Sequence, residues 1–379
     1  MRRTVLLAAV VAMPTVAGAQ SSQFGIRGLG IPTRPISARA AATGGSFALF
    51  EAESGTNPAA ITGAPALQAT FNVLPNTRTS SNPAGEGSAN TVRFPYTAIM
   101  NRIKNTNVYI SAGVGTYADR DYSVTSTDTV ILDGEPVGYD DRLTSKGGVA
   151  DIRLAAGYRP SPKWAVGLGF HFITGSSRME LRRDFTDSTF SEILQRSEIS
   201  YDAIGISAGS VFRLTPKLLL AGTFRVDGTA DVDRDSIDAF KVDLPWSASA
   251  GAQYTLSSRG TLAVTGEYTS WSVANDDLLA VGGIGAEDTW RLSAGAELVT
   301  SSATPAKFPL RLGVRAGSLP FPLTPDVQAT EFGASAGTGL RIAKGRGSLD
   351  LSLERVWRSD DADFSETAWI FGLTVTVRP

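Results

Sequence analysis

"WAVGLGFHFI", residues 164–173, alternates between two kinds of side chain. Its odd and even positions separate into large apolar residues and small or polar ones: Trp164, Val166, Leu168, Phe170 and Phe172 against Ala165, Gly167, Gly169 and His171. Because successive side chains of a strand point to opposite faces, this pattern predicts a strand with one apolar face. Its length of about ten residues suits a tilted strand that crosses a membrane, whereas ordinary strands are nearer five or six residues.

The same alternation recurs in residues 290–298, 310–317 and 348–354. Several of the apolar faces begin or end in an aromatic residue: Tyr158, Trp164, Trp246, Trp290 and Trp369. Such residues favour the two interfaces of a membrane. The strands of a soluble β-sandwich would also alternate between apolar and polar residues. The lengths of the connections between strands must therefore decide between a sandwich and a membrane barrel.

The connections alternate in length. We expect strands at about 66–74, 90–100, 106–118, 148–158, 163–174, 199–213, 217–228, 245–256, 260–272, 287–299, 308–318, 329–342, 347–358 and 366–378. The short connections are 159–163, 215–216, 257–259 and 343–346, and the long polar ones are 119–147, 175–198, 229–244, 273–286 and 319–328. Outer-membrane barrels have short periplasmic turns and long extracellular loops. The sequence therefore predicts an all-β transmembrane antiparallel barrel of about 14 strands over residues 66–379.

The composition limits the chemistry. The 379 residues include no cysteine and one histidine, and the formal charge is −2. Disulfides and thiolate metal sites are excluded, and no basic footprint for nucleic acid is present. A single His171 makes a histidine-based catalytic set hard to build, and nothing in the sequence assembles a serine nucleophile with a base. We expect neither an enzyme, a metal site nor a cofactor.

The first residues form an export signal. Arg2 and Arg3 precede an apolar core at 5–16, and Ala17-Gly18-Ala19 is a small-residue cleavage pattern. We therefore predict a signal peptide over residues 1–19 and placement in the cell outer membrane. No later apolar run reaches the roughly 18 residues of a transmembrane helix.

Residues 20–65 interrupt the strand pattern. The stretch "TGGSFALFEAESGTNPAAIT" (43–62) combines a glycine pair, a helix-like acidic run and an Asn-Pro turn. Glycine permits positive φ or close backbone approach, asparagine caps a helix, and proline fits its first position. A lumen of fourteen strands must be filled or left open, so we expect this segment to be a hatch inside the barrel. Its candidate gating residues are Gly44, Gly45, Phe47, Glu51, Glu53, Asn57 and Pro58.

Charged residues on the polar faces of the strands should point into the lumen, because a basic residue facing lipid costs roughly 2–4 kcal/mol. The candidates are Asp151, Arg153, His171, Arg225, Glu267, Arg291, Glu297, Arg311, Arg315, Glu331, Arg341, Asp350 and Glu354. They could pack a plug and steer a ligand's head group, or simply pair across neighbouring strands. Arg311 and Arg315 are the best candidates for a carboxylate or for a hatch partner, since guanidinium groups bind carboxylates bidentately.

The long loops leave two alternatives open. Their apolar residues could form an outer site that captures hydrophobic ligand, or could contact lipopolysaccharide and other loops: Phe240, Leu244, Leu278, Leu279, Val281, Leu319 and Phe321. Their acids could bind calcium or only keep the loops solvated: Asp121, Asp133, Asp140, Asp141, Asp360, Asp361 and Asp363.

An ordered set of motifs resembles one family. "ARAAATGGSFALFEAESGTNPAAI" (38–61), "DLPWSASAGAQY" (243–254), "EYTSWS" (267–272), "FPLRLGVRAGSLPFP" (308–322) and "FGASAGTGLRIAKGRGSLDLSLERVW" (332–357) resemble the long-chain fatty acid transporter (FadL/TodX, OMPP1) family of outer-membrane barrels. The resemblance implies fourteen strands, an N-terminal hatch and uptake of hydrophobic molecules. The chain departs from the family in its short span between Gly45 and Asn57, in Thr56, in Glu51 and Glu53, and in the ending "TVTVRP".

Together these features predict a monomeric channel for passive uptake of hydrophobic small molecules, such as long-chain fatty acids, gated by the hatch. The resemblance implies lateral release through a strand defect, for which Gly113 and Gly115 are candidates because glycine weakens strand pairing. The alternatives are a non-transport carrier or assembly partner for exported proteins and a general diffusion porin. Expected partners are the ligand, outer-membrane lipid, lipopolysaccharide and the barrel-assembly machinery, and not nucleic acid.

Overall fold

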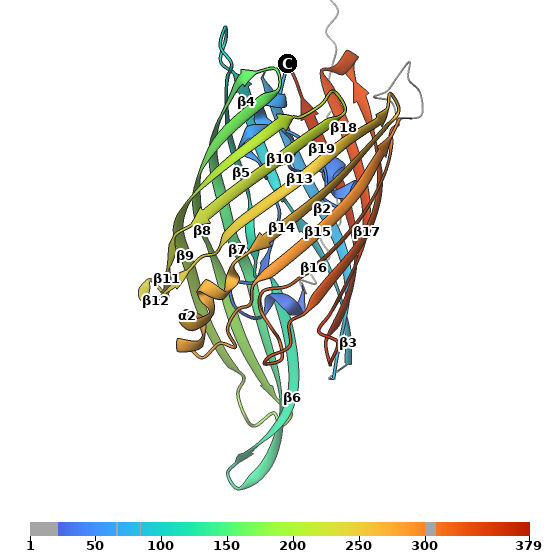
Figure 1. Cartoon of the computed structure of the whole chain (residues 1–379). Coiled ribbons are helices and arrows are strands. Elements are labelled where there is room, and N and C mark those ends of the chain that lie inside the picture. The colour runs from blue at the N-terminus through green and yellow to red at the C-terminus, as the bar shows by residue number, and fades with distance from the viewer. Residues whose placement is uncertain (1–21, 66, 84, 300–307) are drawn as a thin grey trace, which may run out of the picture.

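The computed structural model describes residues 22–65, 67–83, 85–299 and 308–379. The predicted signal peptide at 1–19 lies outside the described residues, as do residues 20 and 21 of the predicted hatch. The described strands close into one antiparallel barrel, with short turns and the C-terminus at one end and long connections at the other (Figure 1).

Successive positions in the wall pair antiparallel, and β19 closes the barrel onto β2. The strands are β1 (Ile31–Pro32), β2 (Gln68–Asn82), β3 (Gly85–Arg93), β4 (Tyr96–Arg102), β5 (Val108–Asp119), β6 (Tyr122–Leu132), β7 (Glu135–Ser161), β8 (Trp164–Phe185), β9 (Ile193–Arg213), β10 (Leu218–Asp227), β11 (Thr229–Arg234), β12 (Ile237–Asp243), β13 (Trp246–Ser257), β14 (Gly260–Thr269), β15 (Thr289–Leu298), β16 (Leu310–Ser318), β17 (Thr330–Ile342), β18 (Gly347–Ser359) and β19 (Ser365–Val377).

Four positions in the wall are each built from two strands in succession. These are β3 with β4, β5 with β6, β10 with β11, and β12 with β13. The first three pairs share the neighbours β2, β7 and β9, while β12 and β13 pair with β11 and β10. The breaks at Pro95 and Pro245 lie where proline cannot donate to a ladder. Since β1 belongs to the N-terminal segment, the wall has 14 strand positions, and the predicted fold is confirmed.

The predicted long loops at 119–147, 175–198 and 229–244 are wrong as loops. Most of their residues continue strands, so that β7 pairs with β8 from Ser161 to Tyr139 and β11 forms a hairpin with β12. These extensions are rich in Thr, Ser and charged residues on both faces, so they carry no apolar period. Beyond the membrane a strand needs no apolar face, and hydrogen bonds between strands are enough to extend the wall.

The outer surface of the barrel is apolar. Leu168, Ile206 and Leu292 are 68%, 61% and 58% exposed. On β8 the outward apolar run begins at Trp164 and ends near Thr174; ten residues span about 33 Å along a tilted strand, which matches an apolar band about 25 Å tall. None of the helices in the described ranges is long and apolar enough to cross a membrane.

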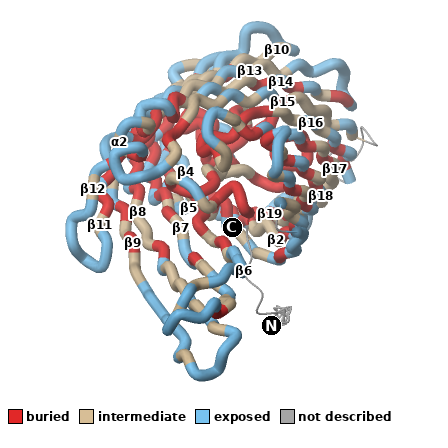
Figure 2. The backbone as a smooth tube through the Cα atoms, turned by 90° about the horizontal axis from the view of Figure 1, so that it is seen from below, coloured by how far each residue is buried: buried red, intermediate tan, exposed pale blue. Residues whose placement is uncertain are grey.

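The N-terminal segment lies inside the barrel. It contains η1 (Gln23–Gly25), β1, α1 (Ala38–Ala42) and η2 (Pro58–Gly63), drawn in blue within the wall in Figure 1. Seen along the axis, buried chain occupies the interior while the rim is exposed (Figure 2). The other helices, η3 (Trp271–Ala274), α2 (Asn275–Ala280) and η4 (Ala343–Gly345), lie in the connections. We call residues 22–36 the N-terminal hatch and residues 37–65 the C-terminal hatch.

Candidate functional site

The C-terminal hatch begins with a capped helix that touches the wall at backbone distance. Ser37 caps α1 by accepting a hydrogen bond from Ala40 N at 3.0 Å. The helix ends at Gly44 and Gly45, which have φ of +66° and +94°. A Cβ on Gly44 would lie 2.4 Å from the carbonyl oxygen of Val314 on β16. These two glycines therefore provide both the positive φ and the close approach that the sequence suggested.

The C-terminal hatch ends on a floor of glycines. Asn57 accepts a hydrogen bond from Ala59 N at 2.9 Å, and its amide donates to Leu49 O at 3.0 Å. Pro58 follows at the first position of η2. A Cβ on Gly167 would lie 2.4 Å from the Pro58 backbone, and one on Gly209 would lie 2.0 Å from Asn57 Oδ1. Gly167 of the quoted strand and Gly209 of β9 thus make room for the hatch, which the alternation of the strand alone did not reveal.

Ion pairs join the hatch to the wall near its short-turn end. Arg39 of α1 donates two hydrogen bonds to Glu297, at 2.9 and 2.7 Å, and its guanidinium lies 5.3 Å from the ring centroid of Phe47. Glu53 pairs with Arg378 at 2.9 Å. These contacts fix the orientation of the hatch relative to β15 and the C-terminal end.

Glu51 is buried in the C-terminal hatch. It accepts hydrogen bonds from Ser37 and from Ser54 (2.6 Å), and its second oxygen lies 3.8 Å from Arg39. Burial raises the pKa of Glu51 to about 7, although Arg39 acts in the opposite direction. The pKa of this carboxyl group therefore lies near neutral pH.

Arg311 and Arg315 form ion pairs with acids of the wall. Arg311 donates to Glu297 and to Asp350, both at 2.7 Å, and Arg315 pairs with Glu331 at 2.9 Å and with Glu354. Both cations are thus bound by acids of the wall, and their expected role as partners of a ligand carboxylate or of the hatch stays a prediction. Arg291 likewise pairs with Glu267 at 2.8 Å, while Arg341 is exposed near the short turns.

One hydrogen-bonded group surrounds His171. Its Nδ1 lies 2.9 Å from Asp151 Oδ1 and its Nε2 2.9 Å from Ser207 Oγ. This is the connectivity of a serine hydrolase triad, which the sequence did not predict. However, Asp151 also binds Arg225 at 2.7 Å and Arg153 at 3.2 Å. Two guanidinium groups disfavour the imidazolium that such a reaction needs, so the arrangement fits a structural network better than a catalytic one.

The lumen on the long-loop side of the hatch is narrow. Its cavity of about 150 Å³ is lined by Arg34, Arg225 and Asp227 among others, whereas ligand sites usually hold 300–1,000 Å³. Arg34 forms no ion pair with another described residue, and burial together with Arg291 lowers its pKa to about 10. A ligand of ordinary size needs the hatch or loops to move.

The mouth beyond this cavity is closed by packed side chains. Of the residues expected to form an outer capture site, Leu244, Leu278 and Phe321 are buried in one cluster with Trp271, Val232 and Val242. Leu319 is buried in a second cluster, Phe240 is partly buried, and Leu279 and Val281 are each 49% exposed. In this conformation most of these apolar loop residues pack into a core, while Leu279 and Val281 stay exposed.

The loop acids gather into no metal site: among the described residues, no group of three or more potential ligands was found. Asp121 accepts a hydrogen bond from Gly147 N at 2.6 Å, and Asp360 accepts one from Ala362 N at 3.0 Å. These carboxylates stabilise turns of the long-loop end.

The wall has a seam between β3 and β5. Gly115 is the last residue of β5 that pairs with β4, and its partner is Tyr96. Beyond Gly115, β5 and β3 form no strand pairing among the described residues. Instead, Pro32 and Ile31 of the hatch pair with Ala118 and Asp119. Gly113 lies inside a regular ladder, between Ala98 and Arg153, so only Gly115 borders the defect.

The N-terminal hatch covers this seam. Thr33 N donates to Tyr117 O at 2.9 Å, and Thr33 Oγ1 donates to Thr116 O. Among the described residues, an Arg93–Asp119 ion pair and a 3.3 Å hydrogen bond from Thr116 Oγ1 to the carbonyl of Phe94 connect the two sides of the seam. Phe94 is 53% exposed on the outside, so the seam faces the apolar band.

Comparison with known proteins identifies the family of this chain. A family model described as BamG matches residues 1–226. The chain belongs to the BamG family. A search of curated proteins found no match to this BamG-family chain.

Solved structures share the fold over almost the whole chain. A FadL homologue of Pseudomonas aeruginosa is 13% identical and covers 92% of this chain and 99% of its own, with a TM-score of 0.64. CymD, a monoaromatic hydrocarbon channel, is 16% identical over 92% and 98%, with a TM-score of 0.59. The toluene transporter TodX of Pseudomonas putida is 13% identical over 92% and 99%, with a TM-score of 0.58. The likeness to FadL and TodX predicted from the sequence is thus confirmed for this BamG-family barrel, at the level of the fold.

Proposed function

We propose that this protein admits hydrophobic small molecules passively across the outer membrane and releases them sideways through the seam between β3 and β5. The observation that carries the proposal is the pairing of hatch residues 31–32 with the β5 edge that β3 leaves unpaired. The lumen cavity reaches the same place, since Pro32, Gly115 and Thr116 line it.

The chemistry of the seam favours an apolar cargo. In a membrane every backbone polar group needs a partner, and the hatch supplies partners for the end of β5. When residues 30–33 move aside, the cavity opens toward Phe94 and the lipid. An apolar solute gains free energy by passing into lipid, whereas a polar one loses its hydration. The known functions of TodX and CymD, a toluene transporter and a hydrocarbon channel, agree with this route.

The test is uptake by vesicles that contain only this protein. We expect entry of a labelled hydrocarbon or fatty acid above that of protein-free vesicles, together with near-zero conductance in planar bilayers. A large steady conductance would identify a diffusion porin. Uptake no faster than in protein-free vesicles would overturn the proposal.

The packed mouth favours a second candidate, a partner role in handling exported proteins. Trp271 is 3% exposed and Phe321 1%, and their rings lie 5.1 Å apart, so this end is built as a solid core. The BamG family name suggests a link to barrel assembly. This role predicts a stable complex with assembly components in native membranes, and no uptake by the isolated protein.

A further inference from the structure

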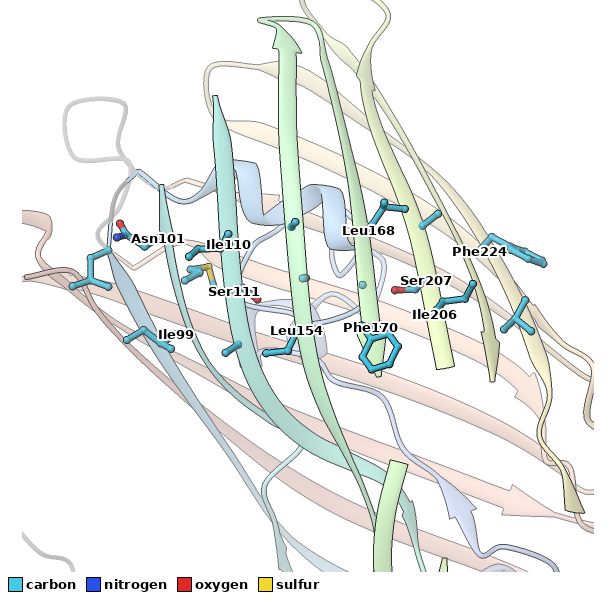
Figure 3. Close-up of a pocket in the computed structure, with 18 residues that line it drawn as sticks. Ile99, Asn101, Ile110, Ser111, Leu154, Leu168, Phe170, Ile206, Ser207 and Phe224 are labelled. Atoms are coloured by element: carbon cyan, nitrogen blue, oxygen red, sulfur yellow. The ribbon is translucent and has the colours of Figure 1, made fainter. Parts of the chain in front are cut away.

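An apolar hollow lies on the outside of the barrel. A groove of about 860 Å³ crosses β5, β7, β8, β9 and β10. Large side chains of neighbouring strands border it, as Figure 3 shows for Leu154, Leu168, Phe170, Ile206 and Phe224. Its floor is formed by small outward residues of the same strands: Ala112, Ala156 and Ala208.

The groove lies behind the glycine floor of the hatch. On the lumen side of the same strands, Gly157, Gly167 and Gly209 touch residues 57–62 at distances that leave no room for a Cβ. The wall is therefore held against the hatch by contacts that only glycine allows. The groove is thus a fixed feature of the plugged barrel and needs no loop movement.

The groove belongs to the periplasmic half of the apolar band. Leu168 is five residues from Lys163 in the short turn between β7 and β8, or about 16 Å along a tilted strand. Asn101 and Leu67, at the same end of the wall, also line it. An acyl chain of the periplasmic leaflet reaches this depth, whereas the outer leaflet lies toward the long-loop end.

The short turns beside the groove carry only positive charge. Residues 101–107, 158–164 and 212–218 contain no aspartate or glutamate and six basic residues: Arg102, Lys104, Arg159, Lys163, Arg213 and Lys217. Arg159 donates to Thr62 O of the hatch at 2.6 Å. Lys104, Lys163, Arg213 and Lys217 are exposed, and none of them forms an ion pair with another described residue.

We propose that this groove and its basic turns bind an anionic phospholipid of the periplasmic leaflet, with acyl chain in the groove and phosphate at Lys163 and Lys217. Charge complementarity selects the occupant. A neutral or zwitterionic lipid would fill the groove equally well but would gain little from four unpaired cations, and basic clusters next to apolar surface attract anionic lipid. The site is independent of uptake, because it lies on the opposite face of the wall from the lumen.

The test compares spin-labelled phosphatidylglycerol with spin-labelled phosphatidylethanolamine around the full-length protein in nanodiscs. We expect phosphatidylglycerol to be immobilised preferentially. Lys163→Gln with Lys217→Gln should reduce this preference roughly twentyfold, since each charge near an anionic lipid contributes about fivefold. Ala156→Leu, which fills the groove floor, should release the immobilised lipid of both kinds.

Matched variants on the far wall serve as controls. Arg259→Gln with Arg346→Gln removes two exposed charges from other short turns, and Ala336→Leu enlarges an outward residue of β17. Both control variants should leave the preference for phosphatidylglycerol unchanged. Heat-dependent gel migration checks that every variant is folded. Equal immobilisation of the two lipids, equal effects of the two double variants, or a groove that retains an acidic protein in place of lipid would each overturn the proposal.

Discussion

The two parts of the hatch are attached to the barrel differently. The C-terminal hatch meets the wall backbone to backbone over Gly167 and Gly313, and Arg39 adds a bidentate ion pair. The N-terminal hatch joins the wall through the short pairing of β1 with β5 and through apolar side chains such as Phe24 and Leu29. From this difference we propose that residues 22–36 move to open the seam while residues 37–65 stay anchored to the wall.

The largest effect should come from crowding the anchor. Gly167→Val places a side chain where the Pro58 backbone lies, at 2.4 Å, so either η2 leaves the wall or the barrel fails to assemble. We expect a loss of at least about 3 kcal/mol, the upper range for overpacking, in denaturant titrations followed by heat-dependent gel migration. Gly222→Val is the control, because the nearest atom to its Cβ, Ser249 O, is 3.5 Å away. Equal stability of the two variants would show that the hatch is not anchored at η2.

Removing the movable part should have the next largest effect. A chain that lacks residues 22–33 should still form the barrel, since the anchor and the strand pairing remain, but its seam would be uncovered. Uptake of a labelled hydrocarbon by reconstituted vesicles should rise several-fold. An unchanged rate would mean that these residues do not cover the exit.

The sequence predicted much of this fold but less of the site. Alternation such as that of 164–173 identified the wall and its strand number, because lipid imposes one apolar face on every strand. Outside the membrane that constraint disappears, and the extended β7, β8 and β9 were therefore mistaken for loops. The roles of Gly167 and Gly209 depend on which chain packs against them, which no local pattern contains. The Ser207–His171–Asp151 group likewise depends on the register between the consecutive strands β7, β8 and β9, which the sequence pattern did not give.

Within the anchor, Glu51 should make docking depend on pH. Its pKa is raised from 4.5 to about 7 in the docked hatch, so the docked state binds the proton more tightly. Docking should be strongest below pH 4.5 and should weaken as the pH rises to about 7, by up to about 3 kcal/mol. Protection of the hatch from added protease should fall from pH 5 to pH 8 in the native protein and stay constant in Glu51→Gln. A parallel fall in both proteins would assign the pH dependence to another group.

The smallest effect should come from the hydroxyl beside His171. Ser207→Ala removes one buried hydrogen bond of 2.9 Å, which costs about 1 kcal/mol, and should leave uptake unchanged. A fluorophosphonate probe should fail to label the native protein. Labelling that disappears in Ser207→Ala would establish a reactive serine and contradict the structural interpretation of this network.

Cross-linking the N-terminal hatch to the seam tests the account most directly. Pro32 and Ala118 are register partners on antiparallel strands, and such pairs have the Cα spacing that a disulfide requires. Since the chain contains no cysteine, Pro32→Cys with Ala118→Cys introduces a single defined pair. In vesicles, the oxidised variant should lose hydrocarbon uptake and recover it on reduction. Equal uptake by the oxidised and reduced forms would contradict exit through a seam covered by the hatch.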